Sequence, residues 1–152
     1  MEPVSILGAA ASAATVVQLC TTGLQSLTRL QHKFSNADLT VRLLITHLST
    51  LRTALGQICE WVEKHAKLSL KNVLPDLTAS LDGCKFLIET LNDRLDSLAY
   101  DDIKGFGMLK KTRMIWAEKE RQSFSTLLGH NIAALQLLLT AMQWYNEVVT
   151  SI

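Results

Sequence analysis

The first part of the chain is long, apolar and free of formal charge. Between Glu2 and Arg29 no side chain is ionised at neutral pH. Removing apolar surface from water is the dominant favourable term in folding, so such a stretch does not stay in solvent. The rest of the protein must either cover this segment or deliver it to another apolar environment.

At helical spacing this stretch separates into two stripes. Alternating steps of four and three residues place one apolar set on a single helix face: Ile6, Ala10, Ala13, Val17, Cys20, Leu24 and Leu27. A second stripe, interrupted by Leu19, is small and mildly polar: Ser5, Gly8, Ser12, Thr15, Thr22 and Ser26. Pro3 suits the first position of a helix. The pattern predicts a helix from about Pro3 to about Lys33.

Three interpretations of this helix compete. Apolar stripes usually face a core, which favours a core helix of a bundle. A transmembrane span is possible by length, but Gln18, Gln25 and several hydroxyl groups dilute the apolar run. A signal peptide would have Ala11–Ala13 as its cleavage site, but the preceding Met1–Pro3 lacks the expected positive charge.

Composition favours one soluble domain. The 152 residues are 48% hydrophobic, which suffices for a substantial core. A net charge of +1 exerts no strong pull on nucleic acid, so no nucleic-acid partner is expected. The three cysteines form no close pair, and no glycosylation sequon occurs, which favours the reducing cytoplasm.

Three further helices are predicted from the same alternation of steps. The second helix carries Ala37, Val41, Leu44, Leu48, Leu51, Leu55, Ile58, Val62 and His65 on one face. The third carries Leu77, Leu81, Cys84, Ile88, Leu91, Leu95 and Leu98, and the last carries Phe124, Leu128, Asn131, Leu135, Leu138, Met142, Tyr145 and Val149. The predicted fold is all-α, an antiparallel bundle of four long helices plus a short helix near 108–116.

Glycine and proline positions refine these boundaries. Pro75 fits the first turn of the third helix, and Gly83 inside that helix predicts close approach of a neighbour. Residues 100–107 are expected to form a connection. The last helix should run from Glu118 to about Val149. It has no charge from Gln122 to Asn146, so we expect it to be the most enclosed helix and to shield the first one.

No catalytic motif is present in the sequence. The four histidines are scattered one to each helical region: His32, His47, His65 and His130. Residues 105–112 lack the spacing of a phosphate-binding loop, and Cys84 lies on an apolar stripe where a thiol packs. The prediction is a protein that is not an enzyme and has no cofactor and no metal site.

Several segments resemble a known family. The opening 1–8 (MEPVSILG), the run into 16–19 (VVQL), the segment 114–120 (MIWAEKE) and the segment 127–135 (LLGHNIAAL) are similar to the fungal N-terminal domain of STAND (NOD-like receptor) and ankyrin-repeat proteins. This is the HeLo-like or HELL group, itself similar to the N-terminal helical bundle of the mixed lineage kinase domain-like protein. The resemblance covers essentially the whole chain and rests on the arrangement of helices.

The resemblance implies a role in fungal programmed cell death and heterokaryon incompatibility. In this group an N-terminal segment, here residues 1–24, leaves the bundle after self-association and disrupts membrane lipid. The domain usually precedes a nucleotide-binding or repeat region. We therefore expect residues 1–152 to be one HeLo-like module of a longer chain, cytoplasmic at rest and relocating to the plasma membrane on activation.

Carried over to this sequence, the resemblance implies two sets of site residues. The membrane-active helix would comprise Val4, Ile6, Leu7, Gly8, Ala10, Ala13, Val17, Cys20 and Leu24. The basic residues Lys104, Lys110, Lys111 and Arg113 would contact anionic lipid, or else form a solvated loop. The alternative function is a non-enzymatic interaction or oligomerisation module of a larger receptor or scaffold.

Overall fold

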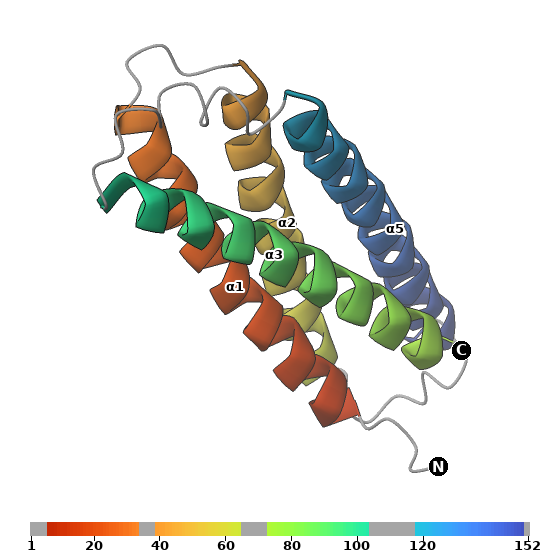
Figure 1. Ribbon diagram of the computed structural model, residues 1–152. Helices are drawn as coiled ribbons and strands as arrows, with labels where there is room; N and C mark the ends of the chain where they lie inside the picture. Colours follow the sequence, from red (N-terminus) through yellow and green to blue (C-terminus); the bar gives the residue numbers. More distant parts are fainter. Residues whose placement is uncertain (1–5, 34–38, 65–72, 104–117, 151–152) are drawn as a thin grey trace.

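The computed structural model describes residues 6–33, 39–64, 73–103 and 118–150. Within these ranges the chain is entirely helical and has no strand (Figure 1). The helices are α1 (Ile6–Lys33), α2 (Leu39–Lys64), α3 (Leu74–Ile103) and α5 (Glu118–Thr150). The all-α prediction is confirmed. The predicted short helix near 108–116 lies outside the described residues.

The helices pack around one continuous apolar core. Helix α1 packs against α2 and α3, and α5 packs against the same two helices. Figure 1 shows α1 and α5 at opposite edges of the molecule, with α2 and α3 between them. Helix α5 therefore does not shield α1, contrary to the sequence-based expectation.

Helix α2 supplies the most regular part of this core. Every described residue of its predicted stripe is buried: Val41, Leu44, Leu48, Leu51, Leu55, Ile58 and Val62. Large aliphatic side chains at alternating three- and four-residue spacing keep one face toward the neighbouring helices over many turns. Ala54 and Trp61 are also buried, so the buried face of α2 is wider than the predicted stripe.

Helix α3 follows its predicted stripe equally well but ends later than expected. Leu77, Leu81, Cys84, Ile88, Leu91 and Leu95 are all buried. Pro75 lies in the first turn, as predicted, and the Leu77 amide donates to the Val73 carbonyl at 2.9 Å. The helix continues to Ile103, so the connection predicted from Tyr100 was placed too early. Aspartates at 101 and 102 cost a helix less than about 1 kcal/mol each, whereas the first glycine comes only at Gly105.

Helix α5 is far more exposed than its composition predicts. Only 28% of the stretch Lys119–Trp144 is buried, although this is the one helix among the described residues long and apolar enough to cross a membrane. Its inner face, with Phe124, Leu128 and Leu135, meets α2 and α3. The expectation of greatest enclosure was wrong because α5 is apolar on two faces and the core covers only one.

The buried face of α1 is rotated slightly from the predicted stripe. Ala10, Ala13, Cys20 and Leu27 are buried as predicted, but Val17 and Leu24 are only partly buried. The most buried line consists instead of Ala9, Ala13, Val16, Cys20, Gly23 and Leu27. This line carries smaller side chains and lets the α1 backbone approach α2 and α3 closely.

Gly23 is the point of closest approach. An added Cβ there would lie 2.9 Å from Asn92 Oδ1 of α3 and 3.2 Å from Leu48 Cδ1 of α2. Gly83, where close approach was predicted, is exposed and would have no atom within 4 Å of an added Cβ. The prediction for Gly83 was therefore wrong, and the tight contact belongs to Gly23.

These two glycines provide a matched pair of substitutions. Gly83→Ala should stabilise the protein by up to about 1 kcal/mol, because alanine favours the helix and meets no obstruction. Gly23→Ala should destabilise it by about 1–2 kcal/mol, because the methyl group must displace the buried Asn92 side chain. Urea unfolding followed by circular dichroism measures both free energies. Equal stabilisation by the two variants would contradict the packing at Gly23.

Candidate functional site

Helix α1 lies at the edge of the bundle, with one face on the core and the other in solvent. Among the predicted membrane-active residues, Ala10, Ala13 and Cys20 are buried, Val17 and Leu24 are partly buried and Gly8 is exposed. Ile6 and Leu7 lie on the helix, but their side chains, like the whole of Val4, are outside the described residues. The described residues of this set thus lie together on one helix, partly in the core.

Small side chains hold the first half of α1 against the core. Ala9, Ala13, Val16 and Cys20 are at most 2% exposed, but none is a large side chain. Among the α1 side chains that the structure describes, Leu27 is the one large side chain that is completely buried, and it lies near the C-terminal end. Stabilisation by burial scales with the apolar area removed from water. The N-terminal half of α1 is therefore held less firmly, per turn, than α2.

Two side chains from neighbouring helices bond to the α1 backbone. Asn92 Nδ2 donates to the Leu19 carbonyl at 3.2 Å, and Cys59 Sγ donates to the Ala10 carbonyl at 3.7 Å. Asn92 is 9% exposed, and its Oδ1 has no hydrogen-bond partner in the structure. Sequence analysis missed Asn92, whose only signal is its place directly after Leu91 on the buried face of α3.

From Ala11 to Thr28 the outer face of α1 is largely exposed and has no formal charge; the first charged residue is Arg29. Ala11, Thr15, Gln18 and Thr22 lie along it. The Thr15 hydroxyl donates to the Ala11 carbonyl at 3.0 Å, and the Thr22 hydroxyl donates to the Gln18 carbonyl at 3.2 Å. These donors are satisfied within the helix itself. The helix can therefore change environment without leaving these two hydroxyl protons unpaired.

All three cysteines are free thiols whose pKa is raised. Burial raises the pKa of Cys20 to about 12, with a further rise from Cys84 and a smaller lowering by Arg52. Burial raises the pKa of Cys84 to about 11. Cys20 on α1 and Cys84 on α3 both belong to the buried core. Because the thiolate is the nucleophilic form, these are packing groups and not catalytic ones.

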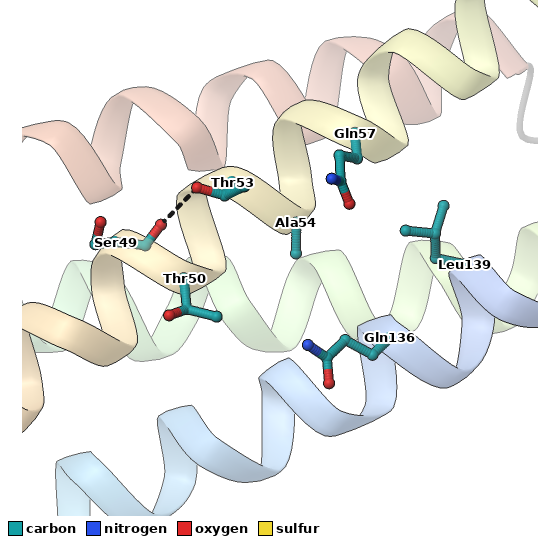
Figure 2. A pocket seen from close by; sticks show the side chains of 7 residues that line it. All are labelled: Ser49, Thr50, Thr53, Ala54, Gln57, Gln136 and Leu139. Carbon is teal, nitrogen blue, oxygen red and sulfur yellow. Dashed lines mark hydrogen bonds between the residues drawn. The ribbon is translucent and has the colours of Figure 1, made fainter.

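A shallow groove of about 340 Å³ lies between α2 and α5 (Figure 2). It is lined by Ser49, Thr50, Thr53, Ala54, Gln57, Gln136 and Leu139. The lining combines hydroxyl and amide groups with two apolar residues, Ala54 and Leu139, and none of the lining residues is ionisable. The Thr53 hydroxyl is already bonded to the Ser49 carbonyl at 3.1 Å. Acid–base chemistry therefore has no participant in the groove lining.

Two polar pairs fix α5 to its neighbours. Ser125 Oγ and His47 Nδ1 are 3.1 Å apart and join α5 to α2, and the Arg94–Glu120 ion pair, at 3.1 Å, joins α5 to α3. A serine bonded to a histidine is also the first element of a nucleophilic site. Here Ser125 is 9% exposed, and neither side chain lines the groove. The pair serves as an interhelical bond.

The remaining predicted site residues receive no structural test. Lys104, Lys110, Lys111 and Arg113 lie outside the described residues. Within the described part of the chain, no three histidine, cysteine, aspartate or glutamate side chains gather in a group able to hold a metal ion. Comparison of the chain with protein-family models, curated proteins and solved structures gives no match.

The buried thiols predict a loss of stability at high pH. Unfolded thiols ionise near pH 9, whereas folded Cys84 and Cys20 keep their protons to about 11 and about 12. The unfolded state therefore binds fewer protons in this interval, so the stability contributed by these thiols is complete below pH 9 and decreases as pH rises toward the folded values. The slope is at most about 1.4 kcal/mol per pH unit for each thiol.

Urea unfolding measured between pH 8 and pH 11 tests this dependence, since roughly 1 kcal/mol per pH unit is readily resolved. Cys20→Ala should flatten the alkaline decrease relative to the unmodified chain. Lysine and tyrosine ionisation is common to both proteins and cancels in the comparison. An unchanged slope in the variant would show that Cys20 is not shielded from solvent.

Proposed function

We propose that this chain is a HeLo-like effector module of a larger cell-death protein, in which α1 leaves the bundle after self-association and enters a membrane. The supporting observation is the placement of α1, which carries no formal charge before Arg29, at the edge of the fold, where small side chains hold its N-terminal half. The proposal takes the four helices as an antiparallel bundle and residues 1–24 as the membrane-active segment. Downstream nucleotide-binding or repeat domains would control its clustering.

The energetics require a trigger for release. Fully burying one large aliphatic side chain is worth about 1.5–3 kcal/mol, and alanine contributes less. Added over all the buried side chains of α1, this free energy keeps the population of the released state low. Clustering raises the local concentration of neighbouring modules and so favours cooperative insertion.

Several features of α1 suit a lipid environment. Ala9 and Ala13, and likewise Ala10 and Ala14, have the small-x-x-x-small spacing that allows close helix packing in membranes. The threonine hydroxyls already donate within the helix. In this proposal the basic residues of 104–113 add about 1 kcal/mol per charge on an anionic surface.

A second function is favoured by a different observation. Helix α5 exposes large apolar side chains, with Leu137 at 72% and Trp144 at 65%. Exposed apolar patches of this kind are typical of protein-binding surfaces. A non-enzymatic interaction module, without membrane activity, is therefore the second candidate.

Substitutions that add charge to the outer face of α1 distinguish the membrane role from the role of an interaction module. Ala11→Lys with Gln18→Lys alters exposed positions, so the folded bundle should be unaffected. Each lysine costs about 2.5–3.5 kcal/mol at the centre of a bilayer. Thr90→Lys with Ser97→Lys adds the same charges at the same spacing on exposed positions of α3 and is the matched control.

Dye release from anionic liposomes, with the chain fused to an inducible dimeriser, gives the readout. Leakage should persist in the α3 control and fall at least about tenfold in the α1 variant and in a deletion of residues 1–24. Equal leakage from all four proteins would exclude α1 as the membrane-active element. Inducer-dependent clustering without leakage by the unmodified chain would favour the interaction module.

A further inference from the structure

The outer face of α5 carries an apolar stripe that no helix in the described part of the chain covers. Alternating steps of three and four residues align Ala134, Leu137, Ala141, Trp144 and Val148, and Leu127 lies seven residues before Ala134. Leu127, Leu137, Trp144 and Val148 are 49%, 72%, 65% and 39% exposed. We refer to these six residues as the α5 stripe.

The α5 stripe has the spacing of a helix–helix seam. Steps of three and four residues keep one face toward a partner helix, as in coiled coils. On α2 the same spacing produces the buried core face, and α5 already uses its other side for that purpose. The inner face therefore explains the fold of α5, and the outer stripe remains to be explained.

Charge indicates which partner suits this surface. From Gln122 to Asn146 no side chain carries a formal charge at neutral pH, so two copies of this face meet without repulsion between formal charges. Lys119 lies in the first turn of α5, beside Glu120, which pairs with Arg94 of the same chain at 3.1 Å, and Glu147 lies in the last turn. In an antiparallel pair of α5 helices, Lys119 of one copy lies at the same end as Glu147 of the other copy. The two helix dipoles then point in opposite directions, which is electrostatically favourable.

We propose that the α5 stripe is a self-association surface through which two copies of this chain form an antiparallel, two-fold symmetric pair. In such a pair the same patch serves both partners. Small and large residues alternate along the stripe, so Leu137 and Trp144 of one copy can pack over alanines of the other. This inference does not depend on the membrane role proposed for α1.

The dimensions of the stripe suit a reversible dimer. From Leu127 to Val148 it is about 30 Å long on a helix about 10 Å wide. Two such faces amount to about 600 Å² in total, less than the roughly 1,200 Å² of stable complexes and in the range of weak, transient ones. We therefore expect an equilibrium between monomer and dimer that shifts with protein concentration.

A bilayer surface suits the stripe less well than a second copy. Helices that lie on membranes carry lysine and arginine beside their apolar face. From Gln122 to Asn146, α5 has none, and its opposite face is engaged in the core. The stripe can therefore make apolar contact with a bilayer, but α5 has no basic side chains in this stretch to attract anionic head groups.

Sedimentation velocity of the 152-residue chain over a concentration series tests the proposal. The unmodified chain should shift from monomer to dimer mass as concentration rises. Leu137→Glu with Trp144→Glu should raise the dimer dissociation constant at least about thirtyfold, because both copies lose apolar contact and gain facing charges. Phe86→Glu, at a residue of α3 that is 74% exposed and lies outside the stripe, is the matched control and should dimerise normally.

Far-UV circular dichroism checks that all three proteins are folded. We expect the same helical content in each, because the substituted positions are exposed. A monomeric unmodified chain at every concentration would overturn the proposal, as would a dimer that survives the double substitution. Co-sedimentation with phosphatidylcholine vesicles that requires the stripe, in a chain that stays monomeric, would identify lipid as the occupant and also overturn it. Failure of the leakage experiment on α1 would leave this result unaffected.

Discussion

The three-helix contact at Gly23 determines how closely α1 can lie against the rest of the protein. The α1 backbone reaches both Leu48 of α2 and Asn92 of α3 there, because glycine leaves the space that a methyl group would occupy. Asn92 uses the same closeness to donate to the Leu19 carbonyl. The small residues that precede Gly23 on the same face, Val16 and Cys20 among them, continue this close approach along the helix. The resulting attachment depends on close packing and on two side-chain hydrogen bonds to the α1 backbone, from Asn92 and Cys59, more than on large apolar side chains.

The sequence predicted α2 and α3 well for a clear physical reason. Each presents large aliphatic residues on a single face, so periodicity leaves one choice of inner side, and every described stripe residue is buried. Helix α1 has alanine and glycine on several faces. Small residues make adjacent stripes nearly equivalent in hydrophobicity, and the observed line through Val16 and Gly23 could not be distinguished from the predicted one.

Helix α5 shows the opposite limitation. Periodicity located much of its inner face, including Phe124, Leu128, Leu135 and Met142, but absence of charge was interpreted as enclosure. A helix can lack charge because it is surrounded or because its outer face meets something beyond the chain, and a single sequence does not separate these cases. The buried Asn92 and the pairing of Ser125 with His47 were equally inaccessible, since each depends on which helices become neighbours.

The positions of α1 and α5 at opposite edges have a consequence for assembly. Any complex built by joining α5 to α5 directs both N-terminal helices outward, onto the two far sides of the pair (Figure 1). Dimerisation at one edge neither covers α1 nor strains its contacts with α2 and α3. The proposed association through α5 and the proposed release of α1 therefore involve different surfaces of the protein.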